Sequence, residues 1–98
     1  MDNPRIARIL GGMADLCEIR GDNVFKVRAL RAAAETIAAL PHDVGALCET
    51  PEELRKIKGI GEGIAKKIVE IHATGTCEEY RELLVDHPES LLEILRIE

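Results

Sequence analysis

The apolar residues of this chain recur every three or four positions in one segment after another, and nowhere do they alternate with the period of a strand. One Tyr and one Phe are the only aromatic residues, so the core has to be built from Ile, Leu, Val and Ala. Such a composition favours packed helices over a β-sandwich. We therefore predict an all-α fold, a compact bundle of five or six short helices in one domain over residues 1–98.

Proline, glycine and capping residues set the bounds of the expected helices. Asn3 followed by Pro4 predicts an N-cap and the start of a first helix, which Gly21 ends. A second helix is expected over 24–39, a short one over 51–57 behind a Thr50–Glu53 capping box, and another over 62–73. Thr76 would cap a fifth helix, and Pro88 would open a sixth. The residues of the first two helices expected to face the core are Ile6, Ile9, Leu10, Met13, Leu16, Cys17, Val27, Leu30, Ala34, Ile37 and Ala38.

Charge is segregated along the chain. The formal net charge is −5, which by itself argues mildly against a nucleic-acid partner, because affinity for phosphate backbones comes largely from Lys and Arg. Residues 20–31 and 55–67 are nevertheless net basic, whereas 32–54 and 76–98 are net acidic. The two basic stretches keep DNA binding open, and the acidic C-terminal segment motivates an alternative, a protein-interaction module.

The cysteines and the hydropathy pattern bound the setting. Three cysteines about thirty residues apart form no zinc-ligand spacing and no disulfide framework, so we expect reduced thiols. No signal peptide and no apolar run of membrane-spanning length are visible. We expect a soluble cytoplasmic protein with no membrane partner, associated with the nucleoid if the source is prokaryotic.

The strongest local signal is the stretch Leu54–Val69, LRKIKGIGEGIAKKIV. Two glycines flank Ile60, which would plug the space between two short helices, and Ala65 would let those helices approach closely. Exposed backbone amides and the N-terminus of the second helix would then form a concavity for phosphate. This pattern is typical of a helix-hairpin-helix, here over about 51–73, which holds a sugar-phosphate backbone without contacting bases. A turn that serves only packing is the alternative.

The similarity extends beyond the hairpin. Phe25–Ala34, FKVRALRAAA, followed by IAALPH, resembles the second helix of the N-terminal domain of family X DNA polymerases, of the polymerase-beta-like type. The segment Leu91–Ile97 resembles the approach to that family's second hairpin, whose glycine turn is missing here. The chain is therefore similar to such a domain cut before its next element, in which case polymerase domains would follow, or to a free-standing relative. Paired aspartates for nucleotidyl transfer are absent, so no polymerase activity is expected of this chain alone.

The resemblance implies DNA as the partner, at a gap, a nick or a junction of single and double strands, as in base-excision or gap repair. Lys26 matches a lysine that binds a 5′-phosphate in the family, although Phe25 replaces a neighbouring histidine and Leu30 a tyrosine. For Arg28 and Arg31, phosphate contact and a solvated face with Arg31 near Glu35 are equally open. The implied DNA-contacting residues are Gly59, Ile60, Gly61, Gly63, Lys56, Lys58, Lys66, Lys67, Lys26, Arg28 and Arg31.

Two further properties are carried over from the family. Several members remove a 5′-deoxyribose phosphate through a lysine Schiff base, and the motif aligns that lysine with Lys67. Partial desolvation at the edge of the apolar stripe would favour its neutral amine, whereas Glu70, one turn on, would oppose it. A lysine that contacts only phosphate or solvent is the alternative. The family's hairpin also often holds Na⁺ or K⁺ through backbone carbonyls, here those of Arg55, Ile57 and Ile60. No other cofactor is expected.

Overall fold

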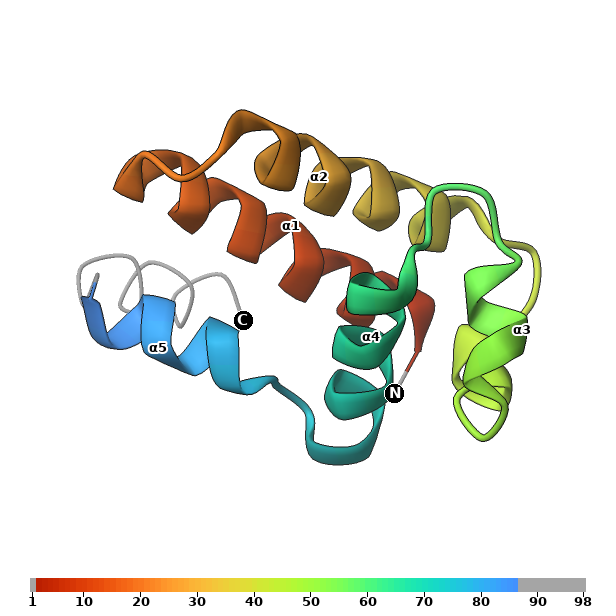
Figure 1. The fold of residues 1–98 in the computed structure, drawn as a ribbon. Coiled ribbons are helices and arrows are strands. Elements are labelled where there is room, and N and C mark those ends of the chain that lie inside the picture. The colour runs from red at the N-terminus through yellow and green to blue at the C-terminus, as the bar shows by residue number, and fades with distance from the viewer. Residues whose placement is uncertain (1, 87–98) are drawn as a thin grey trace.

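The computed structural model describes residues 2–86, and all regular secondary structure within that range is helical (Figure 1). The prediction of an all-α fold is confirmed. The predicted sixth helix, from Pro88, lies outside the described residues. The elements in chain order are α1 (Asn3–Arg20), α2 (Val24–Ala39), the 3-10 helix η1 (Val44–Leu47), α3 (Pro51–Arg55), α4 (Glu62–Thr74) and α5 (Glu78–Asp86).

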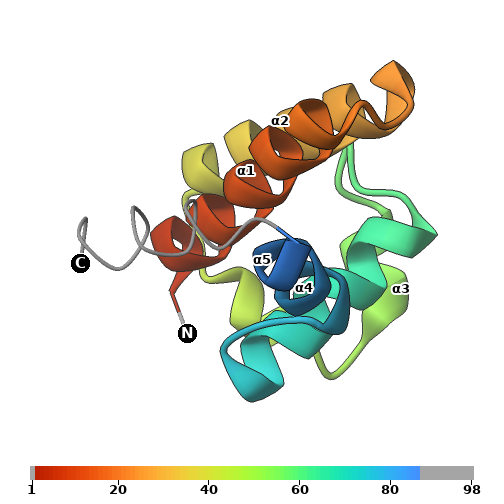
Figure 2. The same ribbon diagram turned by 90° about the vertical axis from the view of Figure 1, so that its left-hand side faces the viewer.

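The helices form two groups that share one core. The helices α1 and α2 lie side by side and antiparallel, joined by a tight turn at Gly21, which ends α1 in the left-handed conformation at φ 83°. The hairpin pair α3 and α4 packs at the end of the molecule where α1 begins and α2 ends (Figure 1). From there α5 runs alongside α1 and packs against it (Figures 1 and 2). This arrangement brings the start of α5 between the hairpin and the α1–α2 pair. No helix among residues 2–86 has the length and apolar character needed to span a bilayer.

Most of the predicted core is buried, but α2 presents a narrower face than the sequence suggested. Ala33 is fully buried, whereas the predicted Ala34 is only half-buried and Ala38 is exposed. On α1, Ile9 is likewise half-buried. The physical reason is that α2 contacts α1 along a single stripe, so residues on the flanks of the helical wheel stay at the edge of the interface. The buried stripe of α2 consists of Val27, Leu30, Ala33 and Ile37.

The predicted N-cap of the first helix is wrong. The N-cap of α1 is Asp2, whose carboxylate accepts from the Arg5 amide at 3.1 Å. Asn3 instead accepts from the amide of Val44 at 2.8 Å and donates to the carbonyl of His42 at 2.7 Å. These two long-range hydrogen bonds, to the first residue of η1 and to the turn before it, take the place of the expected local cap. Thr50 is the N-cap of α3 with Pro51 at its start, as predicted, but the side-chain bonds of a capping box do not form, and the Thr50 hydroxyl donates to the Leu47 carbonyl at 3.4 Å.

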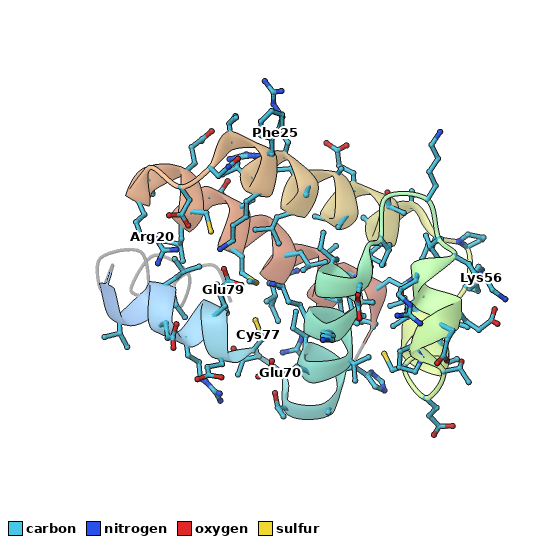
Figure 3. The ribbon with its side chains drawn as sticks, in the orientation of Figure 1. Arg20, Phe25, Lys56, Glu70, Cys77 and Glu79 are labelled. Atoms are coloured by element: carbon cyan, nitrogen blue, oxygen red, sulfur yellow. The ribbon has the colours of Figure 1, made fainter. Side chains whose placement is uncertain are left out.

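The start of α5 is held from another helix. Thr76 was expected to cap it, but the Glu70 carboxylate on α4 accepts from the Glu78 amide at 2.9 Å (Figure 3). A carboxylate at a helix N-terminus satisfies an orphan amide and opposes the positive end of the helix dipole. This bond fixes where α5 begins relative to α4, and with it the direction in which the first turn of α5 points.

Candidate nucleic-acid interface

The hairpin between α3 and α4 is closed by its own backbone and by one apolar side chain. The amide of Ile57 donates to Leu54 at 3.1 Å, and the amide of Ile60 donates to Ile57 at 3.0 Å. Gly59 adopts φ 94°, a left-handed conformation that L side chains rarely adopt. Ile60 is 4% exposed and belongs to the same buried core as Leu54 of α3 and Ala65 of α4. This is the burial that the predicted plug requires.

The N-terminus of α4 is open. Its N-cap is Gly61, in extended conformation, and no side chain caps the first turn. A Cβ built at Gly61 or at Gly63 would meet nothing within 4 Å. The first amides of a helix have no partner inside it, so the amides of residues 62–64 face open space at the positive end of the α4 dipole. Such an end can accept an anion of the size of a phosphate.

The hairpin lysines differ in how free their charge is. Lys58 and Lys66 are exposed, and among residues 2–86 neither has an ion-pair partner. Lys56 projects from the outer side of the hairpin (Figure 3) and pairs with Glu53 at 3.0 Å. Arg55 lies 3.8 Å from Glu62. Among the hairpin lysines, the unpaired charges are therefore those of Lys58, before the N-terminus of α4, and Lys66, in the second turn of that helix.

The two arginines of α2, Arg28 and Arg31, differ in their ion pairs. Arg28 is exposed and has no ion pair within the described range. Arg31 pairs with Asp15 at 3.0 Å and with Glu18 at 3.1 Å, both on α1. The expected proximity of Arg31 to Glu35 is thus not what holds this side chain. Its charge is used to tie α2 to α1.

Lys26 and Lys67, the two lysines matched to the family, form ion pairs with the same carboxylate, that of Glu79. Glu79, in the first turn of α5, pairs with Lys26 through one oxygen and with Lys67 through the other, the latter at 3.1 Å (Figure 3). Asp22 lies 3.8 Å from Lys26 and also pairs with Arg20. Glu70, the expected opponent of Lys67, is instead engaged with α5. In the sequence Glu79 is one of several acidic residues in the net acidic segment 76–98, and nothing in its local sequence distinguishes it from the others.

The pKa directions agree with this arrangement. Burial alone would raise the pKa of Glu79, but hydrogen bonds from Lys26 and Lys67 outweigh it, so that pKa lies below its ordinary value of 4.5. The hydrogen bond to Glu79 raises the pKa of Lys26 above 10.5, against the opposing effect of burial. Both shifts favour the charged forms of Glu79 and Lys26 at neutral pH.

The remaining candidate ligands are dispersed. Burial is the main cause that raises the pKa of Cys17, Cys48 and Cys77, all of which are free thiols. Within residues 2–86 no three His, Cys, Asp or Glu residues lie close enough to hold a metal ion. His72 is half-buried, and its Nδ1 is buried without a hydrogen-bond partner in that range. His42 is exposed.

Comparisons with known proteins agree with this geometry. A family model described as a helix-hairpin-helix domain matches residues 1–77. Over 97 residues the chain is 35% identical to the DNA polymerase/3′-5′ exonuclease PolX of Bacillus subtilis (strain 168). That alignment covers 99% of this chain and 16% of the relative, so the chain spans about a sixth of the length of that protein.

Proposed function

The chain belongs to the helix-hairpin-helix domain family and is homologous to the N-terminal part of bacterial PolX polymerases, and on this premise we propose that it binds DNA without base recognition. The partner we propose is gapped or nicked DNA, or a junction of single and double strands, as met during gap repair in the cytoplasm. The domain would act as one DNA grip of a longer polymerase.

One observation carries the proposal: the open, uncapped N-terminus of α4 between two unpaired lysines. Gly61 and Gly63 leave the first-turn amides without a shielding Cβ. Lys58 precedes this turn and Lys66 follows it, and neither has an ion-pair partner among the described residues, while the one carboxylate of the first turn, Glu62, lies 3.8 Å from Arg55. Backbone amides contact phosphate oxygens whatever the base, so this arrangement supports affinity for the backbone and no sequence preference.

Salt dependence tests the proposal. With roughly four phosphate contacts, affinity for a gapped duplex should fall about a hundredfold between about 50 and 200 mM salt. Fluorescence anisotropy with two duplexes of unrelated sequence measures both the slope and the lack of base preference. An affinity that stays flat with salt would contradict the proposal. A chain that shifts no DNA at any salt, yet self-associates in size-exclusion chromatography, would be a protein-interaction module instead.

A second candidate function, a 5′-deoxyribose-phosphate lyase, is favoured by the meeting of Lys26 and Lys67. The two lysines come from α2 and α4 and share one carboxylate. A phosphate on Lys26 would hold the adjoining sugar aldehyde close to Nζ of Lys67. The neutral amine would add to the aldehyde carbon, and loss of water would give the Schiff base.

Borohydride trapping tests the lyase. The reductant converts the Schiff base into a stable secondary amine that joins protein to a pre-incised abasic duplex. At DNA concentrations that saturate binding, trapping should be lost in Lys67→Ala and retained in Lys66→Ala, whose side chain is exposed on the same helix. Equal trapping in Lys67→Ala and in the unaltered protein would remove Lys67 from this role.

A monovalent cation belongs to the same proposal. The carbonyl oxygens of Arg55, Ile57 and Ile60 would hold Na⁺ or K⁺, which would bridge the hairpin to a phosphate oxygen. The Ile57 carbonyl accepts one bond, from the Ile60 amide, and a carbonyl oxygen has a second lone pair for a cation. Replacing K⁺ by tetramethylammonium at equal ionic strength should weaken DNA binding, since this ion is too large for the turn. Unchanged affinity would argue against the ion.

A further inference from the structure

Glu79 occupies the position between two lysines that an anionic ligand would have to take. Its two carboxylate oxygens are used one each, on Lys26 of α2 and on Lys67 of α4. Both lysines are already matched by a negative charge in the free protein. With Asp22 beside Lys26, and Arg20 beside Asp22, the cluster holds three positive and two negative side chains. Every one of the three cations therefore has a carboxylate partner before any DNA arrives.

The cluster is also accessible. The side chain of Glu79 is 25% exposed, and those of Lys67 and Lys26 are 26% and 39% exposed. Glu79 sits in the first turn of a surface helix whose start is fixed by Glu70 rather than by Glu79 itself. Its carboxylate can consequently leave the lysines by a change of side-chain rotamer, without any movement of the α5 backbone.

We propose that Glu79 is a built-in competitor that occupies the phosphate position between Lys26 and Lys67, and that a phosphate monoester at a DNA 5′ end binds there by displacing it. This inference rests on the proposed DNA binding. It adds a residue that lowers the affinity of the site and decides which phosphates fill it.

The charges of the competing groups give the selectivity. A carboxylate and an internal phosphodiester each carry one negative charge, so exchanging one for the other gains little attraction. A phosphate monoester carries about −1.5 to −2 at pH 7 and offers three acceptor oxygens, so it gains both charge and hydrogen bonds on two lysines. The exchange therefore favours a strand end over a continuous backbone.

The test compares two isosteric variants on two DNA ends. Glu79→Gln removes the competing charge, and Glu78→Gln removes the same charge from the same first turn at an exposed position. Anisotropy would measure each variant on a gapped duplex with a 5′-phosphate and on the same duplex with a 5′-hydroxyl. Glu79→Gln should bind the phosphorylated duplex about threefold to tenfold more tightly than the unaltered chain does. Its affinity for the hydroxyl-ended duplex should match that of Glu78→Gln.

A second substitution identifies where the gain arises. Lys26→Gln in the Glu79→Gln background should abolish the gain on the phosphorylated duplex, because one of the two cations is gone. Circular dichroism melts of each variant confirm that it is folded. If the unaltered chain binds gapped DNA but Glu79→Gln raises both affinities equally, or neither, the role of Glu79 is wrong while the DNA binding stands. If the unaltered chain binds no DNA, the proposed function itself has failed.

Discussion

Three polar side chains in this domain make contacts with distant elements that their local sequence does not predict. Asn3 ties η1 to α1 instead of capping its helix, Glu70 fixes the start of α5, and Glu79 joins three helices through two lysines. Asn3 and Glu70 each make a contact with another element in place of an expected local interaction, and Glu79 makes two such contacts where none was expected. A polar side chain that can satisfy a partner from a distant element does so when the tertiary fold brings that partner within hydrogen-bond distance.

A pH dependence of stability follows at this scale. The lowered pKa of Glu79 means that its contribution is present above the ordinary value of 4.5 and is lost as pH falls through the folded-state value. The raised pKa of Lys26 adds stability that is present below 10.5 and is lost as pH rises through its own folded-state value. Urea denaturation of the unaltered chain and of Glu79→Gln should therefore differ most near neutral pH. The difference should shrink toward about pH 3, and a gap that is constant with pH would contradict this.

At the scale of elements, the hairpin depends on two glycines for different reasons. Gly59 needs a positive φ, and a Cβ there would lie 3.3 Å from the Thr36 hydroxyl on α2. Gly61 has an ordinary extended backbone and open space around it, so its lack of a side chain matters only to a ligand that approaches the amides of α4. One glycine serves folding and the other serves access.

The two glycines should therefore separate stability from binding. Gly59→Ala should destabilise the domain by about 1 kcal/mol or more, through the strained φ. Gly61→Ala should leave the melting temperature nearly unchanged and weaken DNA binding, because its methyl group would stand in front of the amides. Thermal melts and anisotropy on the same samples check both. Loss of stability in Gly61→Ala comparable to that of Gly59→Ala would refute the assignment.

The plug of the hairpin offers an independent measure of the same element. Ile60 is buried between α3 and α4, whereas Ile57 is only half-buried in the preceding turn. Ile60→Ala should cost about 2–3 kcal/mol, from lost burial and the cavity left behind, and Ile57→Ala should cost less. Chemical denaturation measures both. An equal or smaller loss for Ile60→Ala would mean that the hairpin is held together in another way.

At the scale of the whole molecule, net charge is a poor guide to where DNA would bind. The chain is acidic overall. The two lysines without an ion pair among residues 2–86, Lys58 and Lys66, nevertheless belong to the hairpin, whereas Arg31 is paired with two carboxylates of α1. The field near the N-terminus of α4 is set by those lysines and by the helix dipole. An acidic remainder should make binding by the domain alone weak and strongly dependent on salt.

The difference between free and engaged cations can be measured. Lys58→Gln together with Lys66→Gln should reduce the slope of log affinity against log salt by about 1.8, because two phosphate contacts are lost. Arg31→Gln should leave that slope nearly unchanged and lower thermal stability instead, since its partners are on α1. If Arg31→Gln instead reduced the slope by about 0.9, the value for one phosphate contact, Arg31 would contact the DNA.

The sequence by itself determined the helical class, most helix bounds and the hairpin with its Ile60 plug, because these follow from local periodicity, glycine conformations and side-chain size. It also marked Lys26 and Lys67 through a family resemblance. Only the tertiary structure decided that the two lysines share Glu79, that Arg31 faces α1, and that Asn3 and Glu70 serve other elements. Those outcomes depend on which distant helices come into contact, and no local pattern encodes that. The helical periodicity of the apolar residues thus fixed what the chain could fold into, while the packing of α5 decided which charges meet.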